Sequence, residues 1–254
     1  MSIYSITFSP TGGTKRVADI IARNFSDEFT SIDLTCQKTD FEAISFTAED
    51  ICIVAAPAFG GRVPDVAVAR LSQMQGNQAK AILVAVYGNR AYEDTLLELK
   101  NTMIASNFIC VAGIAAIAEH SIMRQFAEGR PDENDKTELA AFAEQIKEKL
   151  NDTEKFHDLH VPGEMPYKEF KGTPMKPETT KDCIKCGLCK DKCPVGAIYM
   201  DGTAKTDSEA CITCMACVAV CPKKARKVSK LVLTAASTKM KKACSGYKKN
   251  ELFL

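Results

Sequence analysis

The chain has 254 residues, of which 46% are apolar and 26% are charged, and its formal net charge is +1. The longest apolar run, Ile51 to Phe59, is broken by Pro57 and is far shorter than the ~20 residues of a membrane-spanning helix. No basic segment with a cleavage site follows Met1, so we expect an ordinary soluble, cytoplasmic protein of one large domain or two.

Strand and helix patterns alternate through the first part of the chain. Five short apolar runs predict strands at residues 3–8, 31–34, 51–56, 81–87 and 108–118. Apolar residues at helical spacing predict helices at residues 14–25, 64–75, 91–106 and 136–150. Near-continuous apolar strands separated by helices are typical of a parallel sheet covered on both faces. We therefore expect an α/β domain with a five-stranded parallel sheet over residues 1–151.

A polar loop that contains glycines follows the first predicted strand, Ser9-Pro10-Thr11-Gly12-Gly13-Thr14. Such a loop at the start of a helix directs backbone N–H groups and hydroxyls at one point, where the helix dipole favours an anion. The chain contains neither a Walker motif nor a Gly-x-Gly-x-x-Gly fingerprint, which excludes those two kinds of nucleotide site. From the loop alone, a phosphate site and a simple helix cap both stay open.

This loop resembles the Thr/Ser-x-Thr-Gly-x-Thr loop of flavodoxins, whose hydroxyls and amides hold the phosphate of FMN. Ser9, Thr11, Gly12 and Thr14 match the pattern, while Gly13 stands where many flavodoxins have Asn. The resemblance implies that the isoalloxazine ring lies between the loops after the third and fourth strands. The implied contacts are Pro57, Ala58, Phe59, Gly60, Gly61, Tyr87, Gly88, Asn89, Arg90 and Tyr92.

Aromatic and ionisable residues near the proposed ring each have two interpretations. Phe59, Tyr87 and Tyr92 are candidates to stack on the flavin, or they belong to the core and its rim. His120 follows the fifth predicted strand and is either a structural hydrogen-bond partner or a proton donor to the site. Arg90 is either a surface residue or a cation that stabilises a reduced flavin. His120 and Arg90 are therefore the catalytic candidates.

Residues 152–181 have a different character, because prolines and glycines interrupt any long element: Pro162, Gly163, Pro166, Gly172, Pro174 and Pro177. This composition predicts a linker or an extended strap along the surface. The basic end of the chain, residues 225–254, is a candidate helix. Residues 222–254 carry a formal charge of +9 and the rest of the chain −8. The basic end is either a solvated helix or a docking surface for an acidic partner; nucleic-acid binding is not expected, because few aromatics are interleaved.

Between the linker and the basic end, one cysteine motif occurs twice, 28 residues apart. The copies contain Cys183, Cys186, Cys189 and Cys193, and Cys211, Cys214, Cys217 and Cys221, and a proline follows each copy. This spacing is typical of [4Fe–4S] ligands, whereas zinc-binding pairs are usually separated by a longer loop. Of the other cysteines, Cys52 and Cys110 lie in apolar runs and are expected in the core, while Cys36 and Cys244 have no visible partner.

Residues 182–224 resemble two-cluster bacterial ferredoxins, including the stretch Pro194-Val195-Gly196-Ala197-Ile198. The resemblance implies that each cluster takes three cysteines from one motif and the fourth from the other. One cluster would be held by Cys183, Cys186, Cys189 and Cys221, and the second by Cys211, Cys214, Cys217 and Cys193.

Taken in order, the chain resembles the flavodoxin–ferredoxin fusion proteins of anaerobes. The resemblance implies FMN and two [4Fe–4S] clusters, with electrons passing between them. Two functions stay open: an electron carrier that docks redox proteins, and a flavin-dependent oxidoreductase that reduces a small molecule with electrons from its ferredoxin domain. An empty flavodoxin domain used for assembly is a third interpretation. Neither nucleic acid nor a membrane is expected as a partner, and a homodimer is left open.

Overall fold

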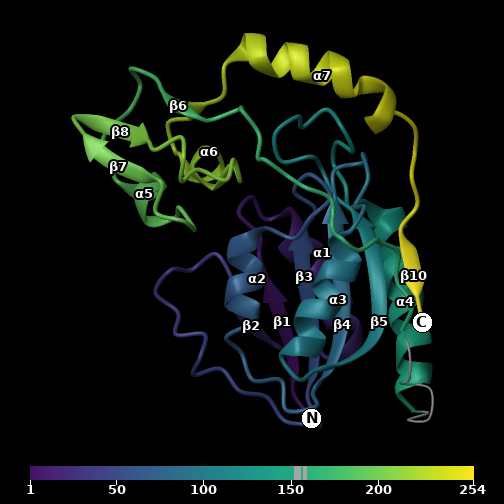
Figure 1. Cartoon of the computed structure of the whole chain (residues 1–254). Coiled ribbons are helices and arrows are strands. Elements are labelled where there is room, and N and C mark those ends of the chain that lie inside the picture. Colours follow the sequence, from purple (N-terminus) through teal and green to yellow (C-terminus); the bar gives the residue numbers. More distant parts are fainter. Residues whose placement is uncertain (152–155, 157–158) are drawn as a thin grey trace.

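The computed structural model describes residues 1–151, 156 and 159–254. A layered α/β domain carries a smaller cysteine-rich domain at one edge of its sheet, and the C-terminal segment runs back from the second domain to the first (Figure 1). The elements of the first domain are β1 (Ile3–Thr7), α1 (Gly13–Phe25), β2 (Thr30–Asp33), β3 (Ile51–Pro57), α2 (Asp65–Leu71), β4 (Lys80–Tyr87), α3 (Thr95–Ala105), β5 (Ile109–Ile117) and α4 (Glu133–Leu150).

The large sheet has the strand order β10-β5-β4-β3-β1-β2. β1 to β5 are parallel, and their order, 2-1-3-4-5, is that of the flavodoxin-like fold. The sequence therefore predicts the fold class and the five parallel strands correctly. The sheet differs from the expected one in a sixth strand, β10 (Glu251–Phe253), which pairs antiparallel with β5.

Helices cover both faces of this sheet, as the apolar strands require. Alternate residues of β3 point to opposite faces: Ile51 and Ile53 pack with α1 and α4, while Cys52 and Val54 pack with α2 and α3. Burial on both faces explains why the central strands read as continuous apolar runs. No helix in the described part of the chain is long and apolar enough to span a membrane.

The described part of the segment between the domains, from residue 159 on, begins without regular structure. The first part of the predicted linker, 152–155 and 157–158, lies outside the described residues. Residues 159–177 contain no helix or strand and lead into β6 (Glu178–Thr179). The cysteine-rich domain then contains α5 (Leu188–Asp191), β7 (Ile198–Asp201), β8 (Thr203–Thr206), α6 (Ala216–Val220) and β9 (Arg226–Lys227). β7 and β8 form a hairpin, and β6 pairs with β9.

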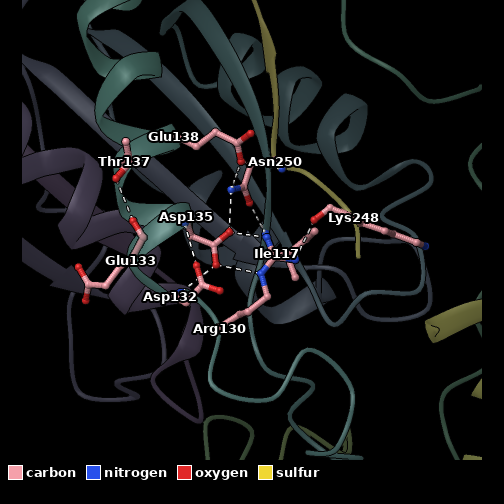
Figure 2. A network of polar contacts seen from close by, with 9 residues as sticks. All are labelled: Ile117, Arg130, Asp132, Glu133, Asp135, Thr137, Glu138, Lys248 and Asn250. Atoms are coloured by element: carbon pink, nitrogen blue, oxygen red, sulfur yellow. Dashed lines mark hydrogen bonds and ion pairs between the residues drawn. The ribbon is translucent and has the colours of Figure 1, made fainter. Parts of the chain in front are cut away.

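The basic end of the chain forms the helix α7 (Lys230–Cys244), which crosses above the carboxyl edge of the large sheet before the chain reaches β10 (Figure 1). A buried polar network anchors this return (Figure 2). Asn250 Oδ1 accepts from the Ile117 N–H at 2.9 Å, and Asn250 Nδ2 donates to Asp135 and Glu138. Arg130 pairs with Asp135 and donates to the carbonyl oxygen of Lys248. These bonds fix the C-terminal segment against the first domain.

Candidate functional site

The loop between β1 and α1 leaves backbone N–H groups free at the start of α1. Gly12 has φ +89, which favours glycine, and directly precedes the helix. The Lys15 N–H donates to Ser9 Oγ at 2.8 Å, and the Arg16 N–H donates to Gly12 O. The N–H groups of Gly13 and Thr14 have no partner within the helix, because the first turn has none to offer. The first turn of α1 has no acidic residue, so this helix end favours an anion.

A cavity of about 370 Å³ opens beside this loop at the carboxyl edge of the sheet. The sequence-predicted residues that line it are Thr11, Gly13, Thr14, Pro57, Ala58, Phe59, Gly60, Tyr87, Gly88, Arg90 and His120. Ligand pockets commonly measure ~300–1,000 Å³, so the cavity has the size for one small ligand. We call it the sheet-edge cavity.

Two glycines of this cavity are in close contact with rings. A Cβ on Gly60 would lie 2.1 Å from Cδ2 of Phe170, and a Cβ on Gly88 would lie 2.7 Å from Cβ of His120. Gly60 also has φ +63, so any other residue there would be strained as well as crowded. The absence of side chains at these two positions lets Phe170 and His120 form part of the cavity wall.

His120 is held as a neutral imidazole in a defined tautomer. Its Nδ1 accepts from the N–H groups of Ile122 and Met123, at 3.1 and 3.2 Å. Burial lowers the pKa of His120 to about 4, so the ring is neutral near pH 7. With Nδ1 acting as acceptor, the ring proton is on Nε2. His120 therefore offers one N–H donor in the wall of the sheet-edge cavity.

Arg90 lines the same cavity but already has a partner. Its guanidinium donates twice to Glu93, at 3.0 and 2.9 Å, and Glu93 also accepts from Lys168 Nζ at 2.8 Å. The hydrogen bonds from Arg90 hold the pKa of Glu93 below its usual range. Burial raises the pKa of the neighbouring Tyr87 to about 12, so that phenol is neutral near pH 7. The uncharged wall is thus formed by Tyr87 and His120, and the charge of Arg90 is balanced by Glu93.

The structure does not bring every predicted contact to the sheet-edge cavity. Ser9, Gly12, Gly61, Asn89 and Tyr92 are not among the residues that line it. Asn89 is buried, has φ +64 and donates to the carbonyl oxygens of Cys244 and Gly246, at 2.7 and 2.9 Å.

Tyr92 contacts the C-terminal segment instead of the cavity. Its ring packs on Tyr87 with a centroid distance of 5.3 Å, and its hydroxyl donates to Glu251 at 3.0 Å. Tyr92 and Asn89 thus both fix the C-terminal segment in place.

Residues of the predicted linker line the sheet-edge cavity, and sequence reasoning missed them: Lys168, Phe170, Thr173 and Met175. Hydrogen bonds hold this segment on the first domain: Asp94 accepts from the N–H groups of Glu164 and Lys168, at 2.9 and 2.7 Å. Arg62 donates to the carbonyl oxygen of Lys168 at 2.8 Å and pairs with Glu98. Aperiodic segments carry no hydrophobic pattern, so no sequence signal marked these positions.

The cysteine-rich domain and α7 complete the cavity. Ile212, Thr213 and Cys214 line it from the second cysteine motif, and Met240 lines it from α7. The Thr213 hydroxyl donates to the carbonyl oxygen of Thr173 at 3.1 Å, which joins this loop to the linker. The wall of the sheet-edge cavity thus comes from both domains.

The eight motif cysteines surround two further cavities. The first cysteine cavity is lined by Cys183, Cys186, Cys189 and Cys221. The second cysteine cavity is lined by Cys193, Cys211, Cys214 and Cys217. In each, three cysteines come from one motif and the fourth from the other. Cys214 lines both the second cysteine cavity and the sheet-edge cavity.

The two motifs share one backbone as well as one spacing. Left-handed residues recur 28 positions apart: Lys185 and Thr213, Gly187 and Met215, Gly196 and Lys224. The N–H of Ala197 donates to Cys193 Sγ and that of Ala225 to Cys221 Sγ, both at 3.2 Å. The repeated turns aim N–H groups at equivalent sulfurs, as thiolate ligands of an iron–sulfur cluster need.

Each cysteine cavity is lined by four sulfurs, the number of thiolates that a [4Fe–4S] cluster uses. A zinc site gathers its ligands at ~2.3 Å from one centre, whereas a cubane spreads four thiolates over four irons. Burial raises the pKa of the Cys214 thiol to about 12, and a metal that bound this sulfur would replace its proton.

Polar contacts join the end of the first motif to the first domain. Arg70 of α2 donates to the carbonyl oxygen of Pro194 at 2.8 Å, and Gln37 donates to that of Cys193.

The four cysteines outside the two motifs lie apart from these sites. Cys52 and Cys110 are buried in the core, Cys36 is half-buried, and Cys244 packs with Met123 and Phe126.

Comparison with known families identifies the cysteine-rich domain. Residues 182–225 match the family model of the 4Fe-4S dicluster domain. A segment of 56 residues is 45% identical to a component of the ion-translocating oxidoreductase complex of Methanosarcina acetivorans. That segment covers 22% of this chain and 21% of the relative, so the chain spans about a fifth of the curated protein it matches.

Solved structures similar to this chain include bacterial flavodoxins. Oxidised flavodoxin 2 from Bacillus cereus is 16% identical, with a TM-score of 0.42 over 59% of this chain and 99% of that one. A flavodoxin of Streptococcus pneumoniae TIGR4 is 20% identical, with a TM-score of 0.40 over 58% of this chain and 97% of that one. The strand order 2-1-3-4-5 of β1 to β5 is by itself that of the flavodoxin-like fold.

The chain thus combines a flavodoxin-like α/β domain with a ferredoxin-type 4Fe-4S domain, the architecture of flavodoxin–ferredoxin fusion proteins. The expectation of this architecture from the loop motif and the repeated cysteines is confirmed.

Proposed function

We propose that the protein is an electron-transfer iron–sulfur flavoprotein, with FMN in the sheet-edge cavity and one [4Fe–4S] cluster in each cysteine cavity. The observation that carries this proposal is the double position of Cys214, which lines both the sheet-edge cavity and the second cysteine cavity. A cluster bound there and a flavin would share this loop as a common wall. FMN supplies exchange of one or two electrons, and each cluster supplies exchange of one.

The residues of the sheet-edge cavity fit FMN. The free N–H groups of Gly13 and Thr14, with the hydroxyl of Thr11, are suited to the phosphate, because the helix end favours an anion without a cationic side chain. Phe59 and Tyr87 supply flat apolar surface, and Gly60 leaves room for close approach. The chain thus offers a polar end for the phosphate and an apolar wall for the ring.

The cysteines would hold the clusters in the sets implied by the ferredoxin resemblance. Cys183, Cys186, Cys189 and Cys221 would bind the first cluster, and Cys193, Cys211, Cys214 and Cys217 the second. The second cluster would lie next to FMN and the first farther out, where Cys186 is exposed. Electrons would then pass between partner protein, first cluster, second cluster and FMN.

One observation favours a second function, a flavin-dependent oxidoreductase acting on a small molecule. The Nε2–H of His120 is a neutral donor in the cavity wall, where it would hydrogen-bond the flavin or a substrate. The cavity volume favours the carrier, because about 370 Å³ lies at the lower end of the ~300–1,000 Å³ range for the site of one ligand.

The test is the cofactor content of protein purified without oxygen, followed by its reactivity. We expect about eight irons and one FMN per chain if the two clusters and the flavin are bound as proposed. After anaerobic reduction, redox proteins and small molecules are offered as acceptors and the flavin and cluster spectra are followed. Turnover with redox proteins only supports the carrier, and rapid reoxidation by one small molecule supports the oxidoreductase. Zinc in place of iron, or no FMN after reconstitution, contradicts the proposal.

A further inference from the structure

Arg226 is a buried cation that has no carboxylate partner among the residues the structure describes. It is 2% exposed and belongs to the short strand β9. Among the described residues, its guanidinium donates to four neutral oxygens, Thr179 Oγ1 at 2.5 Å, Pro177 O at 2.9 Å, Ala204 O at 3.4 Å and Thr206 Oγ1, and over a longer distance to Cys217 Sγ. Nε is buried and has no hydrogen-bond partner in the described part of the chain. Burying a charge costs folding free energy unless an opposite charge compensates it. We therefore expect an anion next to Arg226.

No acidic side chain of the described residues supplies that anion. The buried carboxylates, Asp50, Asp94, Glu98 and Asp135, all belong to the first domain. The described ion pairs join other cations, for example Arg62 to Glu98 and Arg130 to Asp135.

Arg226 faces the two cysteine cavities instead. It lines the first cysteine cavity and the second, and its Nη2 lies 3.9 Å from Cys217 Sγ. A cubane held by four thiolates is a net anion, and reduction adds one more negative charge. One cation between two such clusters would offset the negative charge of both. It would act more strongly on the cluster whose ligand sulfur it contacts.

The repeat shows that this cation breaks the symmetry of the two motifs. The position 28 residues before Arg226 is Ile198, which is buried at the start of β7. The equivalent backbone turns and N–H to sulfur bonds occur twice, whereas the arginine occurs once. The arginine is therefore not a general requirement of the turn that binds a cluster.

We propose that Arg226 is a shared countercation that raises the reduction potentials of both clusters, and that of the Cys217 cluster more. Positive charge and hydrogen bonds at ligand sulfurs favour the reduced cluster. The Cys217 cluster lies on the side of the sheet-edge cavity, so the difference favours an electron next to the flavin. This inference rests on the two-cluster part of the proposed function.

The experiment compares three variants of the full, cluster-loaded chain. Arg226→Met removes the charge, Arg226→Lys keeps it, and Lys227→Met removes an exposed charge from the same strand as a matched control. Iron content is measured first, and both cluster midpoints are then determined by redox titration followed by electron paramagnetic resonance.

In Arg226→Met, we expect the reduction equilibrium of the Cys217 cluster to fall at least tenfold, about 59 mV for one electron, with a smaller fall for the other cluster. Lys227→Met should leave both midpoints close to those of the unmodified chain. If Arg226→Met keeps its iron and the midpoint of the Cys217 cluster falls by less than this, the proposal is overturned. Equal shifts of the two midpoints overturn the claim that Arg226 acts more strongly on the Cys217 cluster.

The iron content shows whether a shifted midpoint reflects the lost charge or a damaged domain. If Arg226→Met loses iron, the result for Arg226→Lys tests the countercation. Full iron with nearly unchanged midpoints in Arg226→Lys supports the countercation, because only the charge is kept. Loss of iron in both variants means that the guanidinium hydrogen bonds hold the domain together, and the proposal fails. Fewer than about eight irons in the unmodified chain would contradict the proposed function itself.

Discussion

The buried pair of Arg130 and Asp135 is expected to control the stability of the first domain and of the returning C-terminus. Asp135 is fully buried and accepts from the Arg130 guanidinium, from the Asp132 N–H at 2.8 Å and from Asn250 Nδ2 at 2.9 Å (Figure 2). Asp135→Ala removes all these acceptors and leaves Arg130, 5% exposed, without its counterion.

The expected loss is large because one partner of a buried pair is removed. Such changes cost ~3–5 kcal/mol, since the remaining charge stays buried and unpaired. In a protein of this size, that loss lowers the melting temperature by roughly 6–20 °C. The double variant Arg130→Met/Asp135→Leu should recover much of the loss, because it leaves neither charge unpaired. Glu133→Gln, on the exposed side of the same helical turn, is the matched control and should change stability by less than about 0.5 kcal/mol.

The same pair predicts a dependence on pH. Burial alone would raise the pKa of Asp135, but the hydrogen bond and charge of Arg130 outweigh it, and the pKa lies below its usual range. A carboxyl whose pKa is depressed by folding stabilises the protein above its unfolded pKa of about 3.9 and loses that contribution as the pH falls through its folded value. Urea unfolding of the anaerobic protein at pH 7 and at lower pH measures both effects. A loss below about 1 kcal/mol at pH 7, or an equal loss in Glu133→Gln, would refute this account.

Two predictions concern the sheet-edge cavity. Thr11→Val removes the hydroxyl proposed to bind the phosphate, so FMN affinity should fall roughly tenfold with iron unchanged, as measured by fluorescence titration; equal loss of iron would indicate misfolding instead. Because the folded pKa of His120 is about 4 and its unfolded pKa about 6.5, stability should fall as the pH drops through this window. His120→Gln should lose less stability there by urea unfolding, and an unchanged slope would contradict the assignment.

The sequence carried enough information for the parallel strands and for the repeat, because both depend on local patterns. Apolar runs such as Ile51–Pro57 are continuous since both faces of β3 are buried. The last strand was not predicted, since Glu251–Phe253 is too short for a periodic pattern and is positioned by Asn250 and the Arg130 network. Polar contacts between residues far apart in the chain produce no local pattern in the sequence.

The cavity wall was predicted in part for the same reason. Thr14, Phe59 and Tyr87 follow from the position of loops at the carboxyl edge of a parallel sheet. Asn89 does not line the cavity, because its side chain bonds carbonyl groups that lie more than 150 residues later in the chain. Phe170 was missed because its position depends on the close approach to Gly60, and neither residue belongs to a periodic element.

The order of the cavities also predicts where a redox protein docks. The second cysteine cavity adjoins the sheet-edge cavity, so exchange with a protein would use the first. There the apolar side chains Ile184 and Leu188 line the cavity and are 55% and 40% exposed, so they offer apolar surface to a partner. Ile184→Glu should therefore slow reoxidation by redox proteins at least about fivefold, since interface anchors contribute more than ~1 kcal/mol.

Two comparisons separate docking from damage to the cluster. Reduction of Ile184→Glu by dithionite should proceed as in the unmodified chain, because a small reductant needs no protein interface. Ile104→Glu introduces the same charge at a residue of α3 that is 51% exposed and belongs to the other domain. Stopped-flow spectra of the clusters measure each rate. Equal slowing in both variants would mean that the added charge alone slows the reaction. No slowing in Ile184→Glu would mean that electrons are exchanged at the flavin and not at the first cluster.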